Sequence, residues 1–216
     1  MAASTSRQTR PGPRGRSPHS PPPPLCNWAR RRPGAPRLAS TSPFHHSRPS
    51  AEHSVNGTRG RWDALEPISP DLARRIVARE ERPGDDWHRE YPLDDELDPL
   101  TSLSAAKPTA TPFTMYLVRR TGDGRAVGGL GFFGPPDATG QVEFGYGLVP
   151  SARGAGLATE AVGLALEHAS AWGARVAVAD TDVKNIASQR FLTKNGLVEV
   201  GRDDALVYYR RSFASR

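Results

Sequence analysis

The stretch from Gln141 to Trp172 constrains the fold of this chain more than any other. The run QVEFGYGLV is typical of a strand, Pro150 ends it, and ARGAGLATEA follows with two glycines ahead of a helical pattern. A glycine-rich turn at a helix N-terminus brings backbone amides and the positive end of the helix dipole together. The sequence therefore predicts a strand–loop–helix unit that binds an anion.

Apolar periodicity on both sides of this unit predicts the rest of the fold. Strands are expected at 65–68, 113–120, 126–133, 141–149, 175–179, 198–200 and 205–209. Helices are expected at 69–82, 94–100, 157–172 and 185–195. Three successive strands ahead of the glycine tract form an antiparallel meander. This order predicts an α/β or α+β domain of three layers with a mixed sheet.

The first 61 residues differ sharply from the rest in composition. They contain eleven arginines, eleven prolines, no lysine and one acid, Glu52, so they carry a net charge of +10, whereas residues 62–216 carry −4. A segment of this kind, with few large apolar residues, cannot bury enough surface to offset its chain entropy. We expect a disordered tail at 1–61, a globular domain at 62–212 and a C-terminal tail at 213–216.

Several interpretations of the tail remain open. The tail is either a solvated arm or an arm that binds nucleic acid or another acidic surface through clusters such as Arg30–Arg32. A transit peptide is also rich in arginine and serine, but the prolines disfavour the amphipathic helix that it needs. A further hypothesis is that translation starts near Val55.

Composition excludes several other classes of protein. No apolar run approaches the roughly 20 residues of a membrane span, and the N-terminus lacks the apolar core of a secretory signal. The one cysteine, Cys26, allows no disulfide framework, and the histidines form no ligand pattern, so no metal site is expected. We expect a cytoplasmic protein that does not associate with membranes; no oligomeric state is predicted.

Three kinds of phosphate-binding loop compete for the glycine tract. A P-loop needs a lysine directly after a glycine, and none of the lysines is so placed. A dinucleotide fingerprint needs a third glycine where Thr159 stands, and its first glycine should follow the strand directly. The third kind is a cradle in which the backbone amides of 153–158 converge on one pyrophosphate, with Gly156 open to close approach.

The pattern R-x-x-G-x-A at 153–158 resembles the Q/R-x-x-G-x-G/A loop of the GCN5-related N-acetyltransferase (GNAT) superfamily. Downstream, N-x-x-S at 185–188 and K-x-G-L at 194–197 are similar to elements of the branch that acetylates ribosomal-protein N-termini and small amines. The resemblance covers roughly residues 62–212. It implies a mixed, mostly antiparallel central sheet with helices on both faces and a splayed pair of parallel strands.

The same resemblance implies that acetyl-CoA lies between strands 142–149 and 175–179, which a bulge at 145–147 would separate. Unpaired backbone groups of Leu148 and Val149 would bond the pantetheine arm. A neutral amine would attack the thioester directly in a ternary complex, with thiolate as the leaving group. The implied coenzyme-binding residues are Leu148, Val149, Arg153, Gly154, Ala155, Gly156, Leu157, Ala158, Thr159, Asn185 and Ser188.

Glu143 and Ser188 are the catalytic candidates. Glu143 is a candidate base, with a solvated strand carboxylate as the alternative. Many relatives place a tyrosine, as acid for the sulfur, at the position of Leu192, so Ser188 is the candidate substitute, with helix packing as the alternative. Asn185 caps its helix, bonds the coenzyme arm, or does both. Arg153 points either at phosphate or into solvent.

The resemblance thus predicts an acetyl-CoA-dependent N-acetyltransferase acting on a primary amine, either a protein N-terminus or a small molecule. The acids between Asp85 and Asp98 could attract a cationic acceptor, or form a solvated loop. Two alternatives belong to other classes. One is a non-catalytic acetyl-CoA-binding module, and the other is a nucleic-acid-associated protein that acts through the arginine-rich tail.

Overall fold

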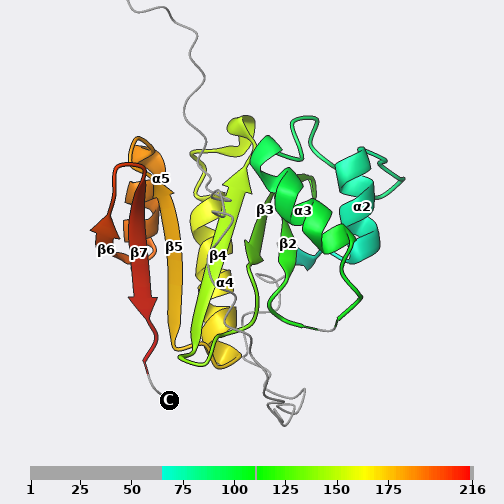
Figure 1. Ribbon diagram of the computed structural model, residues 1–216. Helices are drawn as coiled ribbons and strands as arrows, with labels where there is room; N and C mark the ends of the chain where they lie inside the picture. The colour runs from blue at the N-terminus through cyan, green and yellow to red at the C-terminus, as the bar shows by residue number, and fades with distance from the viewer. Residues whose placement is uncertain (1–64, 110, 215–216) are drawn as a thin grey trace, which may run out of the picture.

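A seven-stranded mixed sheet forms the centre of the molecule, in the order β1-β2-β3-β4-β5-β7-β6 (Figure 1). The structure, a computed structural model, describes residues 65–109 and 111–214, so the predicted tail and its proposed nucleic-acid function lie outside the described residues. The strands are β1 (Leu65–Pro67), β2 (Met115–Arg119), β3 (Ala126–Phe132), β4 (Gln141–Leu148), β5 (Val176–Asp182), β6 (Val198–Arg202) and β7 (Leu206–Ser212). The helices are α2 (Pro70–Ala78), η1 (Asp94–Glu96), α3 (Leu97–Ser104), η2 (Pro150–Ala152), α4 (Leu157–Ala171) and α5 (Ile186–Lys194).

The predicted fold class is confirmed. Neighbouring strands pair antiparallel throughout the sheet except for β4 and β5, which are parallel. The element order also follows the prediction. The largest differences are the end of α2 at Ala78 instead of residue 82 and the extensions of α3 to Ser104, β5 to Asp182 and β7 to Ser212. Within the described residues, no helix is both long and apolar enough to cross a membrane.

Local sequence signals account for the helix ends. Ser69 caps α2, because its hydroxyl accepts a hydrogen bond of 3.1 Å from the amide of Leu72, and proline occupies the first helical position. The α4 helix begins instead at Gly156, whose φ of 82° lies in the left-handed region. This N-cap has no side chain to satisfy the first amides of α4, so the start of the helix is left available to a ligand.

Helices cover both faces of the sheet (Figure 1). The face carrying the side chains of Tyr146 and Leu148 packs against α4, and α5 joins α4 there through the contact of Phe191 with Tyr146. The opposite face meets η1 and α3, where the buried Glu96 side chain lies against Gly129 of β3. Side chains of successive strand residues point to opposite faces, so the two sides of the sheet present different chemistry.

The parallel strands β4 and β5 separate after a short pairing, which confirms the predicted splay. Their register covers only the pairs from Gln141↔Val176 to Glu143↔Val178. Beyond Glu143, β4 continues with β3 while β5 continues with β7 to Asp182. The bulge expected at 145–147 is wrong, because β4 keeps an unshifted register with β3 from Phe144 to Leu148. The gap arises because each strand follows its own antiparallel partner.

Candidate active site

The glycine loop presents a run of available backbone amides. Gly154 and Gly156 have φ values of 87° and 82°, a conformation that other residues adopt only with strain. Glu160 donates the first helical hydrogen bond to the Gly156 carbonyl, at 3.1 Å. Among the described residues, no partner accepts from the amides of residues 154–159. These amides and the positive end of the helix dipole are groups that can bind an anion.

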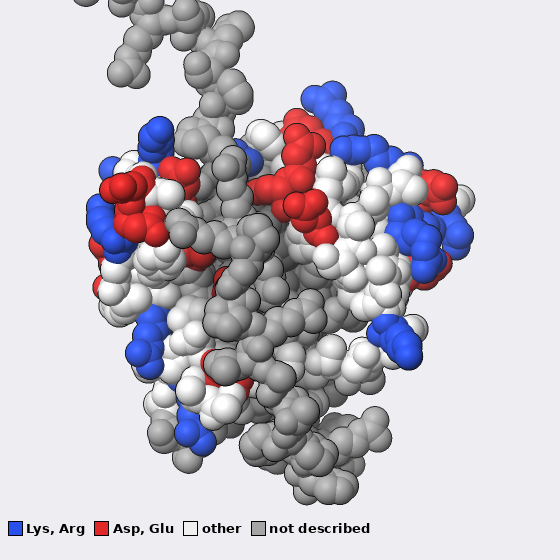
Figure 2. Space-filling view, viewed as in Figure 1, with Lys and Arg blue, Asp and Glu red and all other residues white. Residues whose placement is uncertain are grey.

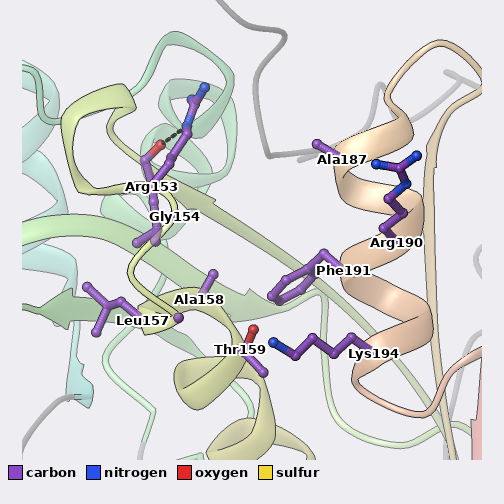
Figure 3. A pocket seen from close by; sticks show the side chains of 11 residues that line it. Arg153, Gly154, Leu157, Ala158, Thr159, Ala187, Arg190, Phe191 and Lys194 are labelled. Carbon is purple, nitrogen blue, oxygen red and sulfur yellow. Dashed lines mark hydrogen bonds between the residues drawn. The ribbon is translucent and has the colours of Figure 1, made fainter.

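A pocket of about 240 Å³ opens beside this loop. It lies between the loop, the end of β4 and one side of α5 (Figure 3). Its lining residues are Leu148, Arg153, Gly154, Gly156, Leu157, Ala158, Thr159, Ala187, Arg190, Phe191 and Lys194. The structure therefore brings most of the predicted coenzyme residues to a single cavity.

Arg153 lines the pocket, but its side chain is bonded to the backbone and does not point freely into solvent. Its Nε donates a hydrogen bond of 2.9 Å to the carbonyl of Leu148, visible as the dashed line in Figure 3. This bond closes the turn between the end of β4 and the glycine loop. The arginine of the motif therefore orders the loop, while the backbone amides of the loop stay available.

The expectation of unpaired backbone at Val149 is wrong. Its amide donates to Val127 at 2.9 Å, and its carbonyl accepts from Ala152 at 2.9 Å, since the chain here continues the β3–β4 ladder into η2. Leu148 differs, because successive amides of an antiparallel strand point to opposite edges. Its amide therefore faces the gap between β4 and β5, where it can bond an extended ligand.

Two cations on α5 line the pocket and are not among the site residues that the sequence predicts. Arg190 and Lys194 are four residues apart, so they occupy one side of α5. In Figure 3 the Lys194 ammonium group reaches toward Thr159 at the start of α4. The four-residue spacing of Arg190 and Lys194 was the signal available in the sequence. It indicates two pocket residues only because α5 packs beside the glycine loop.

Asn185 and Ser188 lie together in a buried cluster at the start of α5. The Asn185 side chain accepts a hydrogen bond of 3.1 Å from the Ser188 amide, so it caps the helix. Both side chains are buried, with exposures of 4% and 1%. The cap therefore fixes the backbone that carries Ser188. Leu192, one helical turn further on, is fully buried in the core.

Tyr146 contacts the catalytic candidate Ser188, and the sequence did not single it out. Its phenol oxygen lies 2.8 Å from the Ser188 hydroxyl, and its ring packs against Phe191 at a centroid distance of 4.4 Å. The signal lies in the alternation of β4, which turns Phe144, Tyr146 and Leu148 toward the helices α4 and α5. The contact between Ser188 and Tyr146 is a tertiary contact, because α5 and β4 lie far apart in the sequence.

Glu143 lies on the other face of the sheet, exposed near the point where β4 and β5 part. The parallel register pairs Glu143 with Val178, so Asp180 of β5 follows on the same face. Burial, with the nearby charges of Glu143 and Asp203, raises the pKa of Asp180 to about 6. The two catalytic candidates, Glu143 and Ser188, therefore stand on opposite faces of the sheet at the same gap.

Asp180→Asn should stabilise the protein more at about pH 8 than at about pH 5. Folded Asp180 keeps its proton up to a pKa of about 6, whereas an unfolded aspartate ionises near pKa ~3.9. The wild type therefore loses stability as pH rises through this interval and carries the full penalty above it. Thermal unfolding at the two pH values measures the difference.

Asp123→Asn is the control of opposite sign for this experiment. Its hydrogen bond with Arg120 lowers the pKa of Asp123 to about 2, so the charged form is favoured in the folded protein. This substitution should slightly destabilise the protein at neutral pH. An Asp180→Asn variant that melts like the wild type at both pH values would contradict the account.

The acids between Asp85 and Asp98 do not act as one group. Burial alone would raise the pKa of Asp85, but hydrogen bonds from Arg75 and Arg82 lower it, and Arg75 also forms an ion pair with this carboxylate. Asp94, Asp95 and Asp98 instead lie in the first turns of η1 and α3. Figure 2 shows acidic side chains gathered on the face that α3 covers.

In the described parts of the chain, no group of three or more His, Cys, Asp or Glu residues is arranged to hold a metal.

The geometry agrees with the results of comparisons with known proteins. Residues 64–198 match the family described as acetyltransferase (GNAT) domain. A comparison with curated protein sequences gives no significant match. Among solved structures, an acetyltransferase of the GNAT family from Bacillus anthracis is 15% identical, with a TM-score of 0.48, over 68% of this chain and 93% of that chain.

Two further structures are similar. The ribosomal-protein-S5-alanine acetyltransferase from Vibrio fischeri is 14% identical, with a TM-score of 0.51, over 68% of this chain and 91% of that chain. A microcin C7 self-immunity acetyltransferase, determined with acetyl-CoA and AMP, is 17% identical, with a TM-score of 0.41, over 46% of this chain and 60% of that chain. The family match covers more than half of the sequence. This chain belongs to the GNAT family of acetyltransferases.

Proposed function

We propose that this protein is an N-acetyltransferase that moves the acetyl group of acetyl-CoA to a primary amine. The observation that carries the proposal is a single pocket beside the glycine loop. The available amides of 154–159 open onto this pocket, and Phe191, which lines it, packs against Tyr146 of the buried polar cluster near the gap between β4 and β5. A ligand with a phosphate at one end and a reactive group at the other matches this layout.

Coenzyme A would lie along this cavity with its pyrophosphate on the amides of 154–159. Lys194 and Arg190 would add positive charge from α5, beside the phosphates. The Leu148 amide would bond the pantetheine arm where β4 and β5 separate. This placement brings the thioester near Tyr146 and Ser188.

The amine would approach from the opposite face, where Glu143 and Asp180 lie. A carboxylate there can hold the acceptor as its ammonium ion and accept the proton that must leave before attack. The neutral amine then forms the N–C bond as the C–S bond breaks, and the thiolate leaves on the side of α5. Holding both substrates across the gap supplies much of the acceleration by proximity.

The acceptor that we propose is the N-terminal amine of a protein. The Vibrio fischeri structure, similar in fold, is a ribosomal-protein-S5-alanine acetyltransferase. The acidic side chains on the acceptor face favour a cationic amine. A small cationic amine meets the same electrostatic requirement and is the alternative that a substrate panel separates.

A thiol-release assay tests the function. The full chain is incubated with acetyl-CoA and either peptides with free N-termini or small amines, and the product mass locates the acetyl group. We expect thiol release that depends on the amine, and Glu143→Gln should lower kcat by roughly 10²-fold or more at neutral pH. Acetyl-CoA binding without turnover on any amine would instead favour a binding module, and Glu143→Gln activity equal to wild type at every pH would remove the proposed base.

Lys194→Ala should raise the dissociation constant of CoA by about 3- to 10-fold, because the pocket loses one cation that faces the phosphates. The effect should shrink as salt is added, since screening weakens a partly exposed ion pair. Lys184→Ala is the matched control, because Lys184 lies in the β5–α5 turn and does not line the pocket. Calorimetric titration at low and high salt measures both. If Lys194→Ala and Lys184→Ala raised the dissociation constant of CoA equally, the net charge of the protein, and not the position of Lys194, would account for the effect.

A further inference from the structure

The Tyr146–Ser188 pair spans the gap between β4 and β5. Tyr146 belongs to β4, whereas Ser188 belongs to α5, which directly follows β5. Their oxygens are 2.8 Å apart and both side chains are buried, with exposures of 5% and 1%. The bond therefore links β4, beyond its last residue paired with β5 (Glu143), to the helix that follows β5.

The surroundings hold both hydroxyls in place. Phe191 packs on the Tyr146 ring, and Asn185 fixes the backbone amide of Ser188. Extending the β4–β5 register would set Thr181 opposite Tyr146, and the Thr181 hydroxyl is fully buried with no hydrogen-bond partner among the described residues. The gap is thus lined by hydroxyl groups, although most of the surrounding core is apolar.

The direction of the Tyr146–Ser188 bond follows from acidity. A phenol, with a usual pKa of about 10, is a much stronger acid than an alcohol, so it is the better donor of the two. When Tyr146 donates to Ser188, the serine keeps its own proton for another acceptor. Among the described residues, Tyr146 is the only hydrogen-bond partner of the Ser188 hydroxyl. No described group accepts the serine proton, so a ligand that reaches this buried hydroxyl would be its acceptor.

We propose that Tyr146 is a positioning residue that directs the Ser188 hydroxyl at the sulfur of the leaving thiolate. This inference rests on the function proposed above. As the amine nitrogen bonds the carbonyl carbon and the C–S bond breaks, the electron pair stays on sulfur, and Ser188 donates a hydrogen bond to it. The amine proton passes to the acceptor-side carboxylate or water, and the thiolate takes one proton from solvent, so the products are amide and thiol.

A double-mutant cycle of Tyr146→Phe and Ser188→Ala tests this inference. We expect Tyr146→Phe to lower kcat by about tenfold, with little change in the KM of either substrate. Because Tyr146 acts through Ser188, adding Tyr146→Phe to Ser188→Ala should cost nothing further. Tyr116→Phe is the matched control, since it also removes a phenol hydrogen bond, of 2.6 Å to Pro112, away from the pocket. Additive effects of the two substitutions, or equal effects of Tyr146→Phe and Tyr116→Phe on kcat, would overturn the proposal.

The thiol pKa of bound CoA gives a readout that needs no acceptor. The absorbance of the thiolate is followed against pH. We expect the pKa of the bound thiol to be lower in the wild type than in Tyr146→Phe by roughly one unit. If no amine is acetylated but this difference is present, the proposed function fails and the inference about Tyr146 stands. If amines are acetylated and the two thiol pKa values are equal, the inference fails alone. CoA that does not bind would overturn both.

Discussion

Replacement of Gly156 by alanine should weaken CoA binding by roughly 10- to 100-fold. Gly156 has a φ of 82°, and apart from its chain neighbours no atom of the described residues lies within 4 Å of where a Cβ would stand. The free space shows that packing does not demand glycine here. The demand comes from the left-handed conformation and from the ligand, because a Cβ would hinder the approach of a pyrophosphate to the loop amides. Losing one or two charge-assisted hydrogen bonds, at about 1.5–3 kcal/mol each, gives an effect of this size or larger.

Gly84→Ala is the matched control for this experiment. Gly84 has a φ of 92° and similarly open surroundings, but it lies after α2 and does not line the pocket. Both substitutions should cost about 1–2 kcal/mol of stability through the left-handed strain. Calorimetric titration with CoA and thermal unfolding separate the two effects. If Gly84→Ala weakened CoA binding as much as Gly156→Ala, the loop would not be the binding site.

Asn185→Ala should reduce both stability and catalysis. The substitution removes the helix cap and leaves the amide of Ser188 buried without its 3.1 Å hydrogen bond. The stability cost should be about 1–3 kcal/mol, and kcat should fall by about tenfold or more because the Ser188 hydroxyl is no longer held at the gap. Thermal unfolding and steady-state kinetics measure the two consequences.

Ser69→Ala removes an equivalent cap from α2, where Ser69 accepts from Leu72 at 3.1 Å. We expect it to lower stability by about 1 kcal/mol while kcat, compared below the melting transition, stays at the wild-type value. A similar loss of kcat in both variants would mean that Asn185 acts only through global stability. An Asn185→Ala variant that is destabilised but fully active would remove Ser188 from the mechanism.

Most of the fold was predictable because it depends on local patterns. The period of apolar residues identified the strands and helices, and Ser69, Pro70 and the glycine tract marked the helix ends. The splay of β4 and β5 followed from the family resemblance, and the register confirms it. The predicted cause of the splay, a bulge at 145–147, was wrong, because a bulge depends on how a strand pairs with its neighbours.

The site was predictable where a motif occupies one continuous segment. The loop at 153–158 forms the predicted turn, although Arg153 turned out to close that turn and Val149 to be fully bonded. The positions of Tyr146, Asp180 and Lys194 beside the candidate site were not predicted, because each depends on a segment far away in the sequence. Ser188 reaches Tyr146 from α5, and Asp180 is near Glu143 only through the parallel register.

The central claim is that the amides of the glycine loop hold the phosphates of coenzyme A. The most direct measurement is a titration of the isotopically labelled protein with CoA, followed through its backbone amide resonances. The largest saturable shifts should occur at residues 154–159, with smaller shifts at Leu148 and Lys194. At a CoA concentration near the wild-type dissociation constant, Gly156→Ala should reduce these shifts strongly. Binding of CoA that leaves the amides of 154–159 unshifted would contradict it.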